Sequence, residues 1–248
     1  MKKLKIEKMN TNSNGYTMLY AALMVVIVAL MLAYVSGALK ETQNSNVKLD
    51  KKKQILSSLL IDTDGRNADS LYNKYIVKGL IINSKGEVLV DSLEAAFEID
   101  MVKELSKKQE ERLIPLYIAN VEGQTKYILT LKGTGLWGPL WGYMSLNEDK
   151  NTVFGTYFSH ASETPGLGAN IADLPFQKEF IGKHILNDKN EFVSIAIMKT
   201  GKIADGQEQV DAISGGTITS KGVEAMLLHC IGQYEPFLLQ PNIGENEK

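Results

Sequence analysis

Apolar residues are concentrated near the N-terminus, where they form the longest hydrophobic pattern of the chain. From Tyr16 to Leu39 no residue is charged, and Leu19–Val35 is almost entirely apolar. A helix rising about 1.5 Å per residue makes this segment about 36 Å long, enough to cross a hydrocarbon core of about 30 Å. Tyr16, Tyr20 and Tyr34 lie near the two ends, where aromatic rings favour the membrane interface. We therefore predict a transmembrane helix over residues 16–39.

The alternative interpretation of this segment is a cleaved signal peptide, because Ser36-Gly37-Ala38 offers small residues at a suitable place. The apolar run is longer than the 7–15 residues of a usual signal core, which favours a retained anchor. The span contains no Asp, Glu, Lys, Arg or His, so the helix by itself anchors the chain and does not conduct ions.

Flanking charges give only a weak indication of the orientation of this helix. Positive charges occur on both sides, and their numbers nearly balance. They are Lys2, Lys3, Lys5 and Lys8 before the span, and Lys40, Lys48 and Lys51–Lys53 after it. This balance weakly favours an N-terminus inside the cell and a domain outside.

The rest of the chain mixes short alternating runs with longer periodic ones. We predict a polar linker over Glu41–Asp50 and helices over Asp50–Ile61, Leu93–Gln109 and Lys221–Gln233, the last from apolar residues at helical spacing. Predicted strands are a hairpin over Lys78–Asp91, then Tyr127–Leu131, Trp141–Leu146, Val153–Phe158, Phe192–Met198 and Val210–Ile213. Because strands and helices do not alternate strictly, the pattern predicts an α+β fold with a mixed, largely antiparallel sheet.

Composition excludes several classes of protein. The chain has 27 basic and 29 acidic residues, a net charge of −2, and only two arginines, Arg66 and Arg112. Such a composition argues against nucleic-acid binding, for which a basic face and bidentate Arg contacts are expected. With Cys230 as its one cysteine it has no disulfide framework, iron–sulfur cluster or cysteine-built zinc site. We expect Cys230 to be a buried small hydrophobe. No three His, Asp or Glu residues show metal-ligand spacing, so we expect no metal site.

The segment Asp211–Ser220, with the sequence DAISGGTITS, runs from a short predicted strand into a predicted helix. Two adjacent glycines let a ligand approach the backbone closely. Hydroxyl groups crowd the point where free N–H groups and the helix dipole favour an anion. This pattern predicts a phosphate cradle, with a plain helix cap by Ser220 or Thr219 as the equal alternative.

Two further clusters lie in the same half of the chain. Leu136–Tyr143 places three aromatic residues among small ones, which suits a planar ring system, although aromatic residues in strands are more often core. Ser159–Ala169 is a polar loop containing one proline and two glycines, whose backbone can offer donors to a ligand or can form only a turn.

These three segments carry a resemblance to a known family. Gly-Leu-Trp at 135–137, Glu-Thr-Pro-Gly-Leu-Gly at 163–168 and the run at 211–220 are similar to the C subunit (NqrC) of the Na⁺-translocating NADH:quinone reductase. The similarity extends from about Lys132 to Phe237 and includes the anchor, and it is loose over residues 41–125. That family has an FMN-binding domain outside the membrane, tethered by one helix, and a motif S-G-[AS]-T whose threonine carries FMN through a phosphoester bond.

The resemblance implies that Thr217 is the FMN acceptor in this chain. Gly216 stands where the family usually has alanine, and His160-Ala161-Ser162 interrupts the usual His-Gly. A threonine hydroxyl is a poor nucleophile, so a separate flavin transferase using FAD is expected to form the bond. The residues expected near the cofactor are Asp211, Ser214, Gly215, Gly216, Thr219, Leu136, Trp137, Glu163, Thr164, Gly166, Leu167 and Gly168. For Asp211 an ordinary turn role, and for Glu163 an exposed structural carboxylate, are the alternatives.

The domain organisation expected from the resemblance is a membrane-anchored one. It comprises a cytoplasmic N-terminus (1–15), the transmembrane helix (16–39), a linker with the N-terminal part of the extracytoplasmic region (40–125), an FMN-binding domain (126–240) and a tail (241–248). The chain would lie in the cell inner membrane with this domain on the periplasmic side. Its partners would be other membrane subunits of the reductase, the flavin transferase and membrane lipid.

Two other functions remain open at the level of sequence. The G subunit of the Rnf-type ferredoxin:NAD⁺ reductase has a similar anchor and motif, but the long insert at 41–125 and the Gly-Leu-Trp segment favour the first family. An anchored ligand-binding module without a redox cofactor is the alternative from a different class.

Overall fold

The computed structural model describes residue 11 and residues 13–241 of the 248-residue chain. The chain divides between Leu49 and Asp50 into two compact units, which we describe separately. Two sets of residues used in the predictions lie outside the described residues. They are the lysines that precede the span (Lys2, Lys3, Lys5 and Lys8) and most of the predicted tail, residues 242–248.

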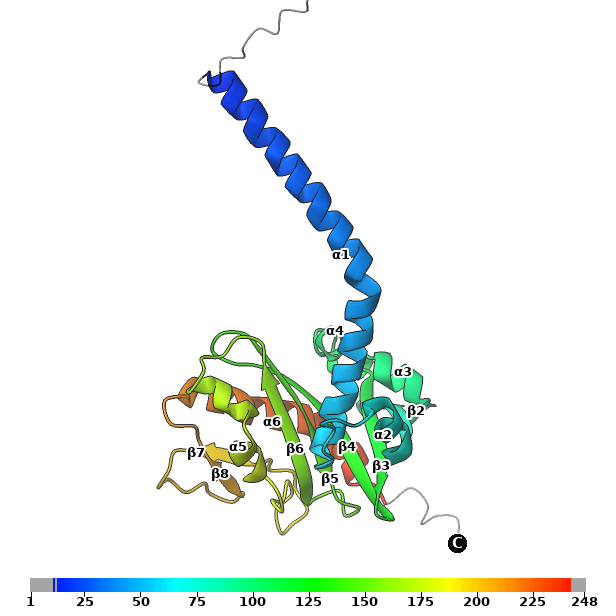
Figure 1. Cartoon of the computed structure of the whole chain (residues 1–248). Coiled ribbons are helices and arrows are strands. Elements are labelled where there is room, and N and C mark those ends of the chain that lie inside the picture. Colours follow the sequence, from blue (N-terminus) through cyan, green and yellow to red (C-terminus); the bar gives the residue numbers. More distant parts are fainter. Residues whose placement is uncertain (1–10, 12, 242–248) are drawn as a thin grey trace, which may run out of the picture. The chain divides into compact units, whose positions relative to one another are not determined.

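The first unit is helical, and its helix continues beyond the predicted span. Helix α1 (Asn14–Ser58) has 45 residues and contains the whole predicted span 16–39 (Figure 1). Among the described helices, α1 is the one that is long and apolar enough to cross a membrane, which fits a membrane anchor. The prediction of a linker over Glu41–Asp50 is wrong, because these residues are helical. They contain no proline or glycine, and adding residues to an existing helix avoids the cost of nucleation.

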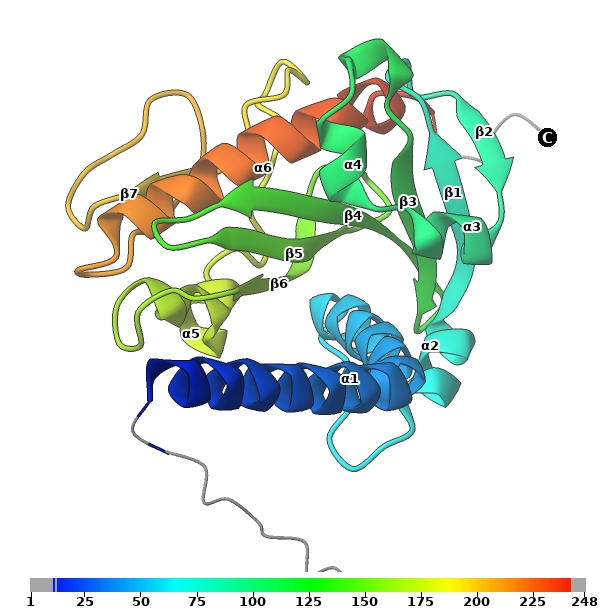
Figure 2. The same ribbon diagram turned by 90° about the horizontal axis from the view of Figure 1, so that it is seen from above.

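The second unit is built on one antiparallel sheet of six strands in the order β2-β1-β3-β4-β5-β6 (Figure 2). The strands are β1 (Ile76–Ile82), β2 (Val88–Asp91), β3 (Ile114–Val121), β4 (Gln124–Thr134), β5 (Pro139–Leu146) and β6 (Val153–His160). The predicted hairpin and the strands of residues 127–158 are confirmed, whereas β3 was not predicted. Because β4 pairs with both β3 and β5, the sheet continues across the boundary expected between residues 125 and 126.

One face of the sheet is covered by the long C-terminal helix. Helix α6 (Thr217–Leu238) crosses this face in Figure 2, and its buried residues join the main core with those of β4 and β5. The hydroxyl of Tyr234 donates to the Pro115 carbonyl (2.8 Å) and accepts from the Thr130 N–H (3.0 Å), which ties the helix to two strands. The helix predicted over 221–233 is confirmed and extends further at both ends.

The opposite face is covered by the last turns of α1 together with α2 (Ala68–Tyr75) and α3 (Leu93–Glu98). Ile55 and Leu56 of α1 are fully buried, and the hydroxyl of Ser145 in β5 donates to the Ser58 carbonyl (2.6 Å). The helix predicted over Asp50–Ile61 is therefore confirmed to Ser58. Helix α2 was not predicted.

Two predicted elements are shorter or more divided than expected. Residues 93–109 form α3, α4 (Met101–Leu105) and the start of the 3-10 turn η1 (Gln109–Glu111), because the Asp100 side chain accepts from the Val102 N–H and starts a new helix. The strand predicted over Phe192–Met198 is confirmed only as β7 (Ala196–Met198), which pairs in parallel with β8 (Gln209–Asp211). The remaining elements are η2 (Gly168–Ala172) and α5 (Leu174–Lys178). The α+β fold with a largely antiparallel sheet is confirmed.

Lys150 allows a test of how the end of α6 is held. Its side chain is buried, and its Nζ donates to the carbonyls of Gln240 (2.9 Å) and Pro241 (3.2 Å). In Lys150→Met both carbonyls lose a charged donor, so we expect the free energy of unfolding to fall by about 2 kcal/mol. Urea unfolding of the full chain in detergent measures this change. The matched variant Lys189→Met, at an exposed position, should be unchanged; equal effects of the two variants would contradict this role.

Cys230 is buried in α6, as predicted, and its Sγ lies 3.3 Å from the Lys132 amide nitrogen and 3.1 Å from the Lys132 carbonyl oxygen. Burial raises the pKa of the Cys230 thiol to about 11. At pH 8 the native thiol is therefore protonated and shielded, and we expect alkylation by iodoacetamide only when the chain is unfolded in urea. An exposed thiol introduced by Ser106→Cys should react at once. Rapid labelling of Cys230 in native protein would refute its burial.

Candidate functional site

Helix α6 begins at Thr217 without a side-chain cap. Gly216 is the N-cap residue, and the preceding Gly215 adopts φ = +73°, a conformation that favours glycine. The first N–H groups of a helix have no intrahelical acceptor, and the helix dipole makes this end positive. The hydroxyl-bearing Thr217 is exposed at this point. The start of α6 can therefore stabilise an anion attached to the Thr217 side chain.

The alternative prediction, in which Thr219 or Ser220 caps the helix, is wrong. Both residues lie within the first helical turns and are buried. The Ser220 hydroxyl accepts from the Ile213 N–H (3.0 Å), and the Thr219 hydroxyl donates to Oε2 of Glu163 (2.6 Å). These two hydroxyls fix the loop before α6 and are already engaged.

Glu163 joins the three segments that the sequence singled out. Its side chain is buried, not exposed as the alternative prediction had it. Oε1 accepts from the Trp137 N–H (2.8 Å) of the loop between β4 and β5, while Oε2 accepts from Thr219 of α6. The Glu163 N–H donates to Nδ1 of His160 (3.1 Å), which gives this histidine a bracing role. We call this arrangement the Glu163 junction.

The loop after β6 fits closely against the start of α6. A Cβ added to Gly168 would lie 2.6 Å from Oε2 of Glu163, and one added to Gly215 would lie 2.5 Å from Cδ2 of Leu167. Gly166 adopts φ = +74°. Thr164 is exposed, and its carbonyl accepts hydrogen bonds from the N–H groups of Leu167 and Ala169. The predicted Pro-Gly loop is thus a fixed part of the junction.

Exposed apolar side chains surround the junction. Each of its three segments contributes at least one large apolar residue that is not buried. The exposed fractions are 48% for Leu136, 64% for Trp137, 42% for Leu167 and 58% for Ile218. Exposed apolar groups beside a helix start suit a planar ring joined to a phosphate. Ile218 was missed by sequence reasoning, because it lies among the hydroxyl residues of the motif.

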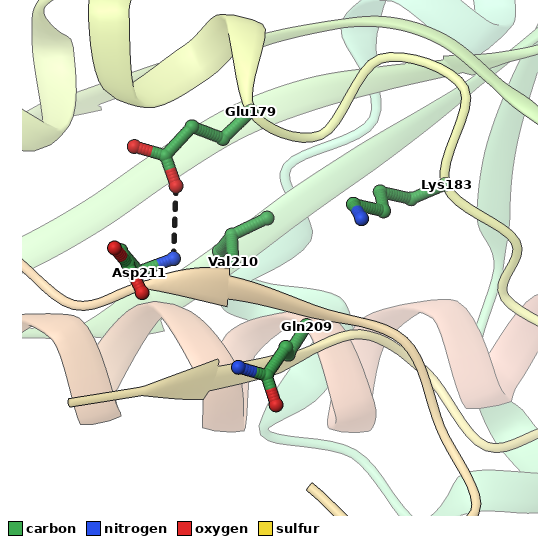
Figure 3. A pocket seen from close by; sticks show the side chains of 5 residues that line it. All are labelled: Glu179, Lys183, Gln209, Val210 and Asp211. Atoms are coloured by element: carbon green, nitrogen blue, oxygen red, sulfur yellow. Dashed lines mark hydrogen bonds between the residues drawn. The ribbon is translucent and has the colours of Figure 1, made fainter. Parts of the chain in front are cut away.

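Asp211 lies outside the Glu163 junction as its bonds define it. It lines an open pocket of about 260 Å³ with Glu179, Lys183, Gln209 and Val210, shown in Figure 3. Its N–H donates to Oε2 of Glu179 (2.8 Å). None of these lining residues takes part in the Glu163 junction, whereas Ser214 is exposed in the loop that leads to Thr217. Among the described residues, no group of three or more His, Cys, Asp or Glu side chains could hold a metal ion.

Comparisons with known proteins give a consistent result. Residues 135–232 match the family model of the FMN-binding domain, which includes most of the junction. The chain is 32% identical over 247 residues to the C subunit of the Na(+)-translocating NADH-quinone reductase of Haemophilus ducreyi, covering 93% of this chain and 95% of that one. It is 29% identical to the corresponding C subunit of Pseudomonas aeruginosa, covering 95% of this chain and 99% of that one.

Solved structures agree with these sequence relatives. The crystal structure of the C subunit of the Na(+)-translocating NADH-quinone reductase from Parabacteroides distasonis has a TM-score of 0.76 and 46% identity, and it covers 82% of this chain and 98% of that one. The crystal structure of Shewanella oneidensis NqrC is 23% identical, with a TM-score of 0.64, and it covers 78% of this chain and 97% of that one. This likeness supports the fold.

The bond between Thr219 and Glu163 can be tested by its removal. In Thr219→Val the carboxylate loses a donor in a buried place, so we expect the free energy of unfolding to fall by about 2–3 kcal/mol. Thr219→Ser keeps the hydroxyl and is the matched control, with a loss of less than about 1 kcal/mol. Urea unfolding of both variants measures the difference. Equal stability of the valine and serine variants would show that the bond contributes nothing.

Proposed function

The chain belongs to the NqrC family, the C subunits of the Na⁺-translocating NADH-quinone reductase, and from this membership we propose that its FMN is bound covalently to Thr217 through a phosphoester bond. As a member, the chain is an electron-transfer flavoprotein subunit of an oxidoreductase complex. One observation supports the proposed covalent link: Thr217 is exposed at the start of α6, which has no side-chain cap.

Thr217 is favoured over the neighbouring hydroxyls by its position. Thr219 and Ser220 are buried and hydrogen-bonded, so a modifying enzyme cannot reach them in the folded chain. Ser214 is exposed but precedes the N-cap residue Gly216 and is not part of the helix. A phosphoester on Thr217 would place its negative charge where the helix dipole stabilises it.

The surroundings of Thr217 fit the rest of an FMN molecule. Leu136, Trp137 and Leu167 provide exposed apolar surface for the ring system, and the backbone of Thr164, Gly166 and Gly168 provides polar groups for its edge. When bound, the flavin supplies the electron-accepting ring. The protein contributes binding, orientation and the electrostatic environment.

We propose that a second protein forms the bond, because a threonine hydroxyl is a weak nucleophile unless a base activates it. We propose a flavin transferase that uses FAD. The Thr217 oxygen replaces AMP on the phosphorus that becomes the FMN phosphate, and the hydroxyl proton is released. Asp211, which lines the pocket together with Glu179, is a proposed contact for this enzyme.

We further propose the cellular arrangement that makes a covalent link useful. Helix α1 anchors the chain in the inner membrane, in contact with lipid and with other membrane subunits of the reductase. The second unit faces the periplasm, where a flavin that dissociated would be lost from the cell. A covalent bond prevents this loss.

The attachment site can be tested by in-gel flavin fluorescence after denaturation. Wild-type chain co-expressed with a flavin transferase should give a fluorescent band, because a covalent flavin survives denaturation. Thr217→Val should abolish the band, whereas the matched variant Ser214→Ala, which removes the other exposed hydroxyl of the segment, should retain it.

Other outcomes of this experiment would point elsewhere. A band that survives Thr217→Val but not Ser214→Ala would move the acceptor to residue 214. Absence of a band from wild-type chain made with active transferase would refute covalent attachment.

A further inference from the structure

The carboxylate of Glu163 has no cationic partner among the residues that the structure describes. Its side chain is 5% exposed, and among residues 13–241 no Lys, Arg or His forms an ion pair with it. The nearby His160 accepts a bond at Nδ1 and therefore offers no proton from that nitrogen. Burying a carboxylate without a counter-ion is costly, so a hydrophobic or neutral residue would have served packing alone better.

The hydrogen bonds of Glu163 indicate that its carboxylate is a hydrogen-bond acceptor. Both oxygens accept hydrogen bonds, Oε1 from the Trp137 backbone and Oε2 from the Thr219 hydroxyl, which is the pattern of an ionised carboxylate. Both donors are neutral groups, so they stabilise the negative charge without cancelling it. The slot is tight, because a Cβ on Gly168 would lie 2.6 Å from Oε2.

The same two donors belong to the segments that surround the proposed flavin. Trp137 offers apolar surface for the ring, and Thr219 lies in the helical turn that begins at Thr217. A flavin held by Thr217 beside Trp137 therefore lies close to a fixed negative charge. Since the charge is buried, solvent and salt screen it little.

We propose that Glu163 is a positioning residue for the flavin whose fixed charge also lowers the reduction potential of the flavin. The inference rests on the proposed function. Reduction adds electrons to the flavin, and a nearby negative charge opposes this addition. Over about 10 Å at an effective dielectric constant near 20, one charge changes such an equilibrium on the order of tenfold. The chain would thus release electrons to its partners more readily.

Glu163→Gln separates the charge from the hydrogen bonds. Glutamine can accept from the Trp137 N–H through Oε1 and donate to the Thr219 hydroxyl through Nε2, so the junction keeps its shape. We expect flavin-loaded Glu163→Gln, purified as the full chain, to titrate at a more positive potential than wild type. At a fixed potential the ratio of oxidised to reduced flavin should fall on the order of tenfold.

Two variants serve as controls in this redox titration. Glu110→Gln removes a negative charge from an exposed position of η1 and should leave the potential unchanged. Glu163→Met is neutral and forms neither hydrogen bond, so it should also shift the potential to a more positive value. It replaces the glutamine variant if that protein cannot be purified. A purely structural role would lower stability without moving the potential.

The results that overturn the inference differ from those that overturn the proposed function. Loaded Glu163→Gln or Glu163→Met with the wild-type potential would refute the electrostatic role. Loss of flavin from both neutral variants, with a loaded Glu163→Asp, would refute it as well, because the charge would then serve attachment alone. Wild-type chain without any covalent flavin would overturn the proposed function first.

Discussion

A single buried carboxylate connects the parts of the chain that form the site. Glu163 bonds to residues 26 positions before it and 56 positions after it, and through them it joins the loop at Trp137 to the start of α6. Each of these segments alone would be an ordinary turn or helix end. Held together, they place an exposed hydroxyl, free N–H groups and apolar side chains at one position, which is what a tethered flavin requires.

The fold explains why this junction can be rigid. Helix α6 is attached to the sheet along its length, with Cys230 against Lys132 and Tyr234 bonded to both β3 and β4. Its N-terminus is therefore fixed by contacts far from the site. The loops that contact the start of α6 begin directly at the ends of β4, β5 and β6. A rigid frame limits the reorganisation that accompanies electron transfer to and from a bound flavin.

Local patterns predicted those parts of the fold whose signals are contained in a short stretch of sequence. The apolar span at 16–39, the hairpin with its turn at Asn83–Gly86 and the periodic helix at 221–233 were of this kind. Strand β3 was missed because Pro115 interrupts its apolar run, and the carbonyl of that residue is satisfied by Tyr234, far away in sequence. The prediction for Glu41–Asp50 was wrong because the polar residues of this segment indicate exposure to solvent, whereas its backbone is helical.

The site was recognisable from its motifs, but its geometry was not. The hydroxyl-rich run at 211–220 indicated an anion at a helix start, yet only the structure shows that α6 begins at Thr217 and that Thr219 is buried. Burial of Glu163 depends on distant partners, which no local pattern encodes. The family likeness extends over 93% of the chain, including residues 41–125, the part that separated NqrC from its Rnf-type alternative.

Covalent attachment at Thr217 is measured most directly by the intact mass of the full chain purified from cells that make a flavin transferase, followed by peptide mapping across Val210–Lys221. We predict a mass increase of one FMN less one water, located on Thr217. An unmodified mass, or an FMN located on another residue, would contradict it.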